Sequence, residues 1–190
     1  MRCFVAVDVA SEVRAAIVRA QAALRAAAPH ADVRWTGPAA FHVTLKFLGA
    51  VADERVPAVI AAVGRAIAGA EPLALAAAGL GAFPTRARAR VVWAGIAVGG
   101  ESVAALASAI DAALAPLGFP VEERPFHAHL TIGRVRSPRG ARELAAALED
   151  RATDSFGAWT AGEVVLYESR LRPTGAEYAR VADWRLGNEA

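Results

Sequence analysis

Two short segments of the chain carry the residue types that acid–base chemistry needs. "HVTL" (residues 42–45) and "HLTI" (residues 129–132) both read histidine, apolar residue, threonine, apolar residue. The two histidines are 87 residues apart (129 minus 42), close to half of the 190-residue chain, and the chain holds only four histidines. A repeat at this distance indicates two related lobes, each of which contributes one strand with this motif.

The spacing inside each motif predicts that the histidine and the threonine share one face of a β-strand. Side chains at positions i and i+2 of a strand point to the same side. His42 and Thr44 therefore project together while Val43 points to the opposite face, and His129 projects together with Thr131. A single histidine on a strand is more often a packed core residue, but two matched copies point to a site.

Two imidazoles and two hydroxyls in one site suit the hydrolysis of a phosphodiester. Imidazoles titrate near neutral pH, so one can take a proton from water while the other gives a proton to the leaving oxygen. Threonine hydroxyls can donate hydrogen bonds to the phosphoryl oxygens, where negative charge must be held. A cyclic phosphodiester is strained, and its ring can open without a metal ion. The motif pair therefore predicts metal-independent hydrolysis of a cyclic phosphodiester, with no cofactor.

The hydrophobic periodicity along the chain predicts alternating strands and helices. With hairpin-like connections between strand pairs, this order favours an α+β fold of antiparallel sheets, each covered by helices on one side. Ser11 and Asp53 are the expected N-caps of the first two helices. The expected strands cover residues 3–9, 41–48, 72–83, 88–98, 127–135, 162–169 and 176–186, with a short one beginning at 33, and the expected helices cover 12–28, 53–69, 101–116 and a segment starting at Ser137.

The composition predicts a soluble cytoplasmic protein of one domain, residues 1–190. The chain is 55% apolar and 21% charged, which is typical of a packed globule. Cys3 is the only cysteine, so an intramolecular disulfide is impossible and a reducing compartment is expected. The alanine-rich stretch 103–117 is too short to cross a bilayer, so no membrane association is expected. We expect a monomer.

The residues around both motifs resemble those of the two-histidine (2H) phosphoesterase superfamily, and within it the RNA 2′,3′-cyclic phosphodiesterases, also called 2′-5′ RNA ligases. The signature of that superfamily is His-x-Thr-apolar occurring twice. "VRWTGPAAFHVTLKFLG" resembles the family's first-motif region and "RPFHAHLTIGRVR" its second-motif region. The resemblance covers nearly the whole chain. One departure is Ala128, where relatives often have proline before the second histidine.

The resemblance implies a bilobal α+β fold with pseudo-twofold symmetry. The two interleaved lobes have helices on their outer faces, and a cleft lies between the lobes. It also implies that the protein opens a 2′,3′-cyclic phosphate at an RNA end and leaves a 2′-phosphate. By the same resemblance, His42 is the proton donor to O3′ and His129 is the proton acceptor. The expected partners are RNA ends or oligonucleotides, and 2′-5′ ligation is expected as a reverse side activity.

Three residues outside the motifs are candidates for substrate binding. Arg134 lies five residues after His129, so simple alternation puts it on the opposite face, but a bend at Gly133 could turn it towards phosphate. Phe41 and Phe126 flank the motifs and could stack on a nucleobase, although core packing explains them equally well.

Two other classes of function remain open from the residues alone. His127 and His129 share a strand face, and with His42 they could bind zinc, which would make the protein a metal-dependent hydrolase. That arrangement leaves Thr44 and Thr131 unexplained. The second alternative is a non-catalytic module that holds an RNA end or a nucleotide, for which binding would survive the loss of either histidine.

Overall fold

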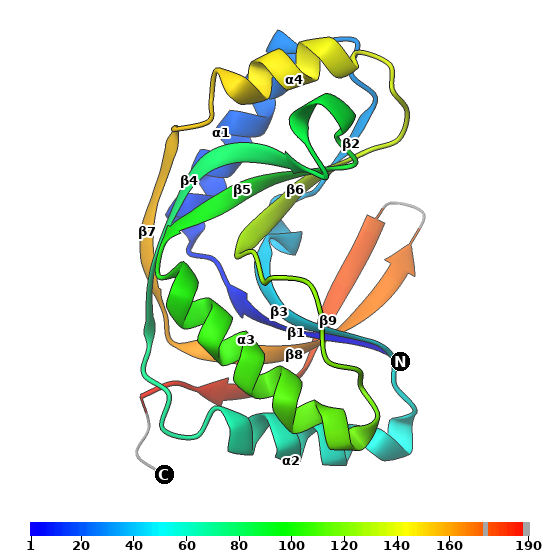
Figure 1. The fold of residues 1–190 in the computed structure, drawn as a ribbon, viewed down its shortest axis with the longest axis vertical. Coiled ribbons are helices and arrows are strands. Elements are labelled where there is room, and N and C mark those ends of the chain that lie inside the picture. The colour runs from blue at the N-terminus through cyan, green and yellow to red at the C-terminus, as the bar shows by residue number, and fades with distance from the viewer. Residues whose placement is uncertain (173–174, 188–190) are drawn as a thin grey trace.

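The computed structural model describes residues 1–172 and 175–187 (Figure 1). Within these residues, four α-helices are interleaved with single strands and runs of two or three strands, and four short 3-10 turns (η1–η4) lie between these elements. In chain order the elements are β1 (Arg2–Asp8), α1 (Ser11–Ala27), β2 (Val33–Trp35), η1 (Pro38–Ala40), β3 (His42–Ala50), η2 (Asp53–Arg55), α2 (Val56–Ala66), β4 (Leu73–Phe83), η3 (Arg86–Arg88), β5 (Val91–Val98), α3 (Gly100–Leu114), η4 (Ala115–Leu117), β6 (His129–Val135), α4 (Ala141–Glu149), β7 (Ser155–Ala161), β8 (Glu163–Arg172) and β9 (Gly175–Arg185).

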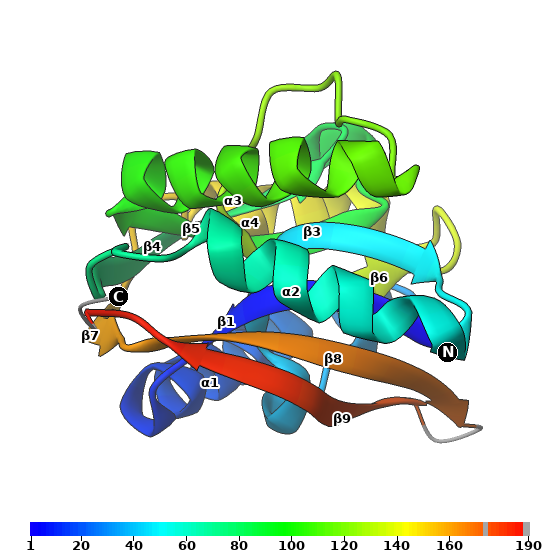
Figure 2. The ribbon, with the colours of Figure 1, turned by 90° about the horizontal axis from the view of Figure 1, so that it is seen from below.

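The strands form one strongly curled antiparallel sheet in the order β7-β4-β5-β6-β3-β1-β8-β9, with β2 added beside β6 (Figures 1 and 2). Its two halves, β7-β4-β5-β6 and β3-β1-β8-β9, meet where β3 pairs with β6. Helices α2 and α3 pack together beside the half that contains β3, and α1 and α4 pack together beside the other half. The predicted α+β class, with antiparallel strands and helices on the outside, is confirmed.

Side chains of β1 alternate between two apolar environments. Cys3, Val5 and Val7 point into the main core, which the helices cover. Phe4 and Ala6 point to the opposite face and belong to a separate small cluster with Val165, Tyr167 and Tyr178. The strand is thus buried on both faces, which explains why its sequence is an almost unbroken apolar run.

A buried ion pair ties α3 to β3. Lys46, the only lysine of the chain, is 9% exposed, and its Nζ donates hydrogen bonds to Asp111 of α3 and to the carbonyl oxygen of Pro120 at 2.6 Å. The second carboxylate oxygen of Asp111 accepts a hydrogen bond from the backbone N–H of Glu122 at 2.9 Å. These contacts fix the start of the loop that leads from α3 to the second histidine motif.

Residues 100–117 are long and apolar enough to cross a membrane when only length and composition are considered. In the structure they form α3 and η4. The side chains of Val103, Ile110 and Leu114 are fully buried in the main core.

The predicted helix starts differ from the observed ones at three places. Ser11 is the first residue of α1 and not its cap, since Ala10 holds the N-cap position without a side-chain hydrogen bond. Asp53 begins η2, and α2 starts three residues later, at Val56. Helix α4 starts at Ala141 and not at Ser137. Its N-cap is Gly140 at φ 67°, where a Cβ atom would lie 2.4 Å from the backbone N of Ala31.

Strand β7 was not predicted. Its sequence, "SFGAWTA", lacks a clear alternation of apolar and polar residues, and only Phe156 and Ala161 are buried. The strand forms because it completes the edge of the sheet by pairing with β4 from Leu73 to Ala78. Pairing with a strand distant in the sequence thus stabilises β7, which the local pattern of residues does not predict.

Candidate active site

The two histidine motifs lie side by side at the middle of the sheet. The central residues of the motifs, Val43 and Leu130, are cross-strand partners, and both are fully buried in the main core. The histidines and threonines therefore project from the opposite face of the sheet, which we call the motif face. Continuing this antiparallel register by one residue in each direction places His42 opposite Thr131 and His129 opposite Thr44. Directly opposed residues have Cβ atoms about 5 Å apart, so the four side chains are gathered in one place.

Each imidazole bonds to the backbone carbonyl two residues before it. Nδ1 of His129 lies 2.7 Å from the carbonyl oxygen of His127, and the ring of His42 is hydrogen-bonded to the carbonyl of Ala40. Carbonyl oxygens only accept, so the bonded ring nitrogen must carry a proton. In the neutral ring of His129 the other nitrogen, Nε2, is then an unprotonated base.

Aromatic rings flank both imidazoles. The ring of His42 lies 4.6 Å from that of Phe4, and its edge meets Tyr178 at 5.1 Å. The ring of His129 meets Phe83 at 5.0 Å, with the two planes nearly perpendicular. These contacts restrict the orientation of both rings and remove water from their sides.

Burial lowers the pKa of both histidines. It lowers the pKa of His42 from 6.5 to about 4, an effect that the charge of Asp8 partly opposes and the charges of Arg14 and His129 reinforce. Burial also lowers the pKa of His129, with smaller contributions from His127 and Arg134. Both imidazoles are therefore neutral at pH 7 in the free protein. A bound phosphate would raise both pKa values, because its negative charge favours the imidazolium form.

The lowered pKa of His42 makes the stability of the fold depend on pH. Between pH 6.5 and about 4 the unfolded chain binds a proton that the native His42 refuses, so the free energy of unfolding falls as the pH is lowered through this window. A shift of this size corresponds to at most about 3 kcal/mol. We expect thermal unfolding of His42→Gln to lose this part of the pH dependence. An unchanged dependence in the variant would contradict the assigned pKa.

A β-bulge follows each motif threonine. In β3, Thr44 pairs with Ala6 and Lys46 with Val5, so Leu45 is an extra residue. In β6, Thr131 pairs with Trp93 and Gly133 with Val92, so Ile132 is an extra residue. The extra residue reverses the alternation beyond it.

The bulge in β6 turns Arg134 to the motif face, which simple alternation would not do. Arg134 is exposed; its charge adds a little to the burial that lowers the pKa of His129 and partly opposes the burial that raises the pKa of Tyr178. The irregularity lies at Ile132, next to Gly133, where the sequence suggested a bend.

The bulge in β3 does the same for Phe47, a residue that the sequence reasoning missed. Phe47 is 67% exposed, and its ring lies 6.0 Å from that of Phe4, the ring that packs on His42. Phe47 and Arg134 hold matching positions, each five residues after a motif histidine. This match is the signal that could have drawn attention to Phe47.

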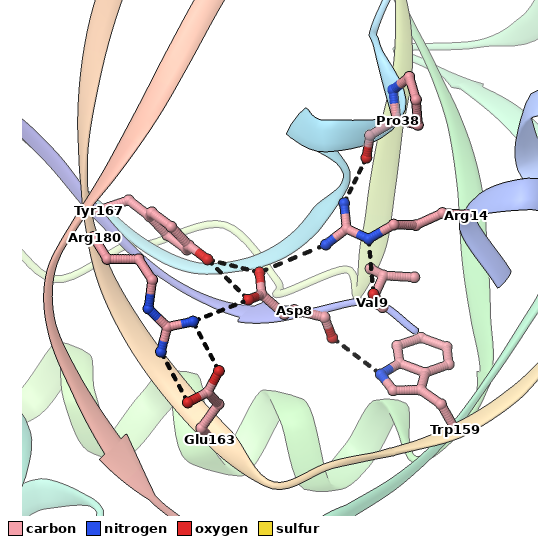
Figure 3. A network of polar contacts seen from close by, with 8 residues as sticks. All are labelled: Asp8, Val9, Arg14, Pro38, Trp159, Glu163, Tyr167 and Arg180. Atoms are coloured by element: carbon pink, nitrogen blue, oxygen red, sulfur yellow. Dashed lines mark hydrogen bonds and ion pairs between the residues drawn. The ribbon is translucent and has the colours of Figure 1, made fainter. Parts of the chain in front are cut away.

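A cavity of about 450 Å³ opens beside His42. Its polar wall is centred on Asp8, the cross-strand partner of His42 (Figure 3). The carboxylate of Asp8 accepts hydrogen bonds from the Tyr167 hydroxyl at 2.8 and 2.9 Å and lies between the guanidinium groups of Arg14, at 3.7 Å, and Arg180, at 3.5 Å. The full lining is Asp8, Arg14, Pro38, Ala39, Phe41, His42, Tyr167, Tyr178 and Arg180.

The two arginines of this wall are themselves held in place. The Nε of Arg14 donates to the carbonyl oxygen of Val9 at 2.8 Å, and Arg180 makes a two-bond contact with Glu163 at 2.9 and 2.8 Å. Sequence reasoning did not single out this group. A carboxylate at the end of an otherwise apolar strand, as at Asp8, is the signal that was available.

The remaining predicted residues occupy different environments. Phe41 is 1% exposed and belongs to the main core, so the predicted stacking role does not fit this position. Phe126 is 38% exposed on the loop before β6. The ring of His127 packs on Trp93 at 5.0 Å, and lies 6.1 Å from the ring of His129. Within residues 1–172 and 175–187, no three His, Cys, Asp or Glu side chains gather as metal ligands, so the zinc site considered from the sequence lacks a third ligand there.

Comparison with known proteins identifies the family of this chain. The family model described as "LigT like Phosphoesterase" matches residues 7–93 and 97–178. The RNA 2′,3′-cyclic phosphodiesterase of Methanothermobacter thermautotrophicus is 33% identical over 186 residues, which cover 98% of this chain and 99% of that protein. The protein of the same name from Archaeoglobus fulgidus is 33% identical over 178 residues, covering 94% and 96% of the two chains.

Solved structures show the same fold. The crystal structure of TT0787 of Thermus thermophilus matches with a TM-score of 0.82 at 29% identity and covers both chains completely. The structure of E. coli LigT complexed with 3′-AMP matches with a TM-score of 0.75 at 26% identity and covers 98% of both chains. The protein described here belongs to the LigT-like phosphoesterase family, within the 2H phosphoesterase superfamily.

Proposed function

We propose that this protein opens the 2′,3′-cyclic phosphate at RNA ends, without a metal ion, and leaves a 2′-phosphate. The observation that supports this most strongly is the cross-strand pair Val43–Leu130, because it gathers two imidazoles and two hydroxyls on one face of the sheet. The names of the relatives from M. thermautotrophicus and A. fulgidus point to the same substrate.

In the proposed reaction the two histidines act in opposite directions. His129 takes a proton from a water molecule as the water oxygen bonds to phosphorus, and the bond from phosphorus to O3′ breaks. His42, which takes up a proton once the phosphate is bound, gives that proton to O3′. The product keeps the phosphate on O2′. Thr44, Thr131 and Arg134 donate hydrogen bonds to the non-bridging oxygens, where charge builds up.

The same geometry admits ligation as a side activity. A 5′-hydroxyl of a second RNA end in the place of water would form a 2′-5′ bond and release the same O3′. Water is present in large excess, so hydrolysis dominates.

We expect the protein to be a monomer and to be located in the cytoplasm.

The cavity beside His42 is the proposed site for the terminal nucleoside. O3′ belongs to the ribose of that nucleoside, so the sugar must lie on the side of the residue that protonates O3′. The half-buried ring of Tyr178 borders the cavity and can contact the base or sugar. Phe126 and Phe47 are the exposed rings proposed for stacking on further bases.

An oligoribonucleotide that ends in a 2′,3′-cyclic phosphate tests the proposed reaction. We expect turnover in excess chelator, and a product that carries only a 2′-phosphate. The position of the phosphate can be read by phosphorus NMR, and a 3′-phosphomonoesterase that spares 2′-phosphates provides an independent assay. A 3′-phosphate product, or activity that chelator abolishes and zinc restores, would contradict the proposal.

The pH dependence of turnover should be bell-shaped, since one imidazole must be charged and the other neutral. For kcat/KM, which reports the free enzyme, we expect the maximum below pH 6.5, because burial lowers the pKa of both histidines. The maximum of kcat should lie at a higher pH, because the bound phosphate raises the same pKa values. Rates measured from pH 4 to 9 with a cyclic mononucleotide test this. A profile that stays flat between pH 5 and 9 would count against paired-histidine catalysis.

A further inference from the structure

Arg34 and Arg134 are direct cross-strand partners where β2 pairs with β6. Their strand neighbours Val33 and Trp35 pack against the main core, and a Cβ atom on Gly133 would lie 2.8 Å from Val33 and 3.1 Å from Trp35. These residues occupy the core side of the two strands. Arg34 and Arg134 must therefore project from the other side, which is the motif face.

Two arginines directly opposite each other on one face repel, and this placement costs stability unless an anion lies between them. Both side chains are exposed. Within residues 1–172 and 175–187, neither of them makes an ion pair. Several other arginines, by contrast, are neutralised by an acidic side chain. Those arginines are Arg14, Arg86, Arg124, Arg136, Arg151, Arg170 and Arg180.

The pair continues the active site along one edge of β6. Extending the Val43–Leu130 register by one residue places His42 opposite Thr131, and three residues further along β6 Arg134 pairs with Arg34. Strand β2 thus takes the place beside β6 that β3 leaves. The separation along the strand is about 10 Å, a distance that long guanidinium side chains can shorten. Arg134 is close enough to His129 and Tyr178 for its charge to affect the pKa of both.

We propose that Arg34 binds the phosphodiester that precedes the terminal nucleotide of the RNA, next to Arg134, which faces the cyclic phosphate. This inference rests on the proposed function and adds a substrate preference to it: an oligonucleotide end is favoured over a mononucleotide. The direction fits the chemistry, because the ribose lies on the side of His42 and the RNA chain must leave the site on that side. A guanidinium suits this ligand, since its planar fork matches two phosphate oxygens.

The test compares two substrates that differ by one internal phosphate. They are adenosine 2′,3′-cyclic phosphate and the dinucleotide ApA with a terminal 2′,3′-cyclic phosphate. For Arg34→Gln, we expect the loss of kcat/KM on the dinucleotide to exceed the loss on the mononucleotide by about 5- to 20-fold. The extra loss should be in KM, and the dependence of log(kcat/KM) on log[salt] should become shallower by about 0.7 for the dinucleotide.

Arg65→Gln is the matched control, because Arg65 is an exposed arginine on α2, away from the motif face. It should affect both substrates equally. Equal losses on both substrates for Arg34→Gln, or no loss on either, would overturn the inference. If the wild-type protein turned over neither substrate, the proposed function would fail first. Binding of a labelled oligonucleotide with a 2′-phosphate, measured by fluorescence anisotropy for wild type and Arg34→Gln, would then still decide whether Arg34 contacts the RNA backbone.

Discussion

Alanine in place of His42 or His129 should lower kcat for cyclic-phosphate opening by about 10²–10⁴-fold, with little change in KM. In the proposed reaction each substitution removes a proton transfer that occurs in the transition state, and positioned acid–base groups contribute rate factors of this size. Because the two rings act as a unit, the double variant should be little worse than the poorer single variant. Initial rates with adenosine 2′,3′-cyclic phosphate measure all three effects.

The other two histidines provide the controls for this prediction. His30 is exposed, belongs to neither motif and is bonded to Glu143 of α4 at 2.9 Å, so His30→Ala should retain wild-type turnover. His127→Ala leaves the carbonyl that holds His129 in place and should lose less than tenfold. Loss of activity in His127→Ala as severe as in His129→Ala would favour the zinc alternative over the paired-histidine account.

Asp111→Ala should destabilise the protein by about 3–5 kcal/mol, because it leaves the Lys46 ammonium buried without its partner. Lys46 is 9% exposed, and its one remaining strong contact would be the carbonyl oxygen of Pro120 at 2.6 Å. The substitution also frees the backbone N–H of Glu122, which loosens the loop that leads to β6. Urea or thermal unfolding followed by circular dichroism gives the free energy directly.

The double variant Lys46→Met with Asp111→Leu separates the cost of an unpaired charge from the worth of the pair. Replacing both charged groups with apolar residues of similar size should recover most of the loss. A double variant as unstable as Asp111→Ala would show that the pair itself, and not the unpaired charge, provides the stability.

The centre of the site could be predicted from the sequence because it depends on local rules. A strand places residues i and i+2 on one face, so "HVTL" was enough to predict that His42 and Thr44 project together. The same rule places Phe41 on the side of Val43, in the core, which argues against the stacking role. The repeat then predicted that a second strand would supply the other half.

The parts that escaped prediction depend on contacts between distant segments. The bulges at Leu45 and Ile132 are defined by pairing with β1 and β5, and they decide which way Phe47 and Arg134 point. The start of α4 was misplaced because a tight approach between Gly140 and Ala31 ends the preceding turn. Neither feature leaves a mark in the local pattern of apolar residues.

The cavity wall around Asp8 shows the same limit more strongly. Its members come from β1, α1, β8 and β9, and the hydrogen bond from Tyr167 to Asp8 joins residues 159 positions apart. No motif connects these residues along the chain. Only the order of the strands brings β8 beside β1 and so closes the wall next to His42.

We propose that the two imidazoles move protons in opposite directions, and a change of leaving group tests this most directly. In a cyclic nucleotide with sulfur in place of O3′, the leaving group is a thiolate. Its conjugate acid has a pKa of about 8.5, so its departure needs little help from an acid. We expect this substrate to restore most of the activity of His42→Ala while His129→Ala stays impaired. Equal restoration of both variants, or of neither, would contradict the account.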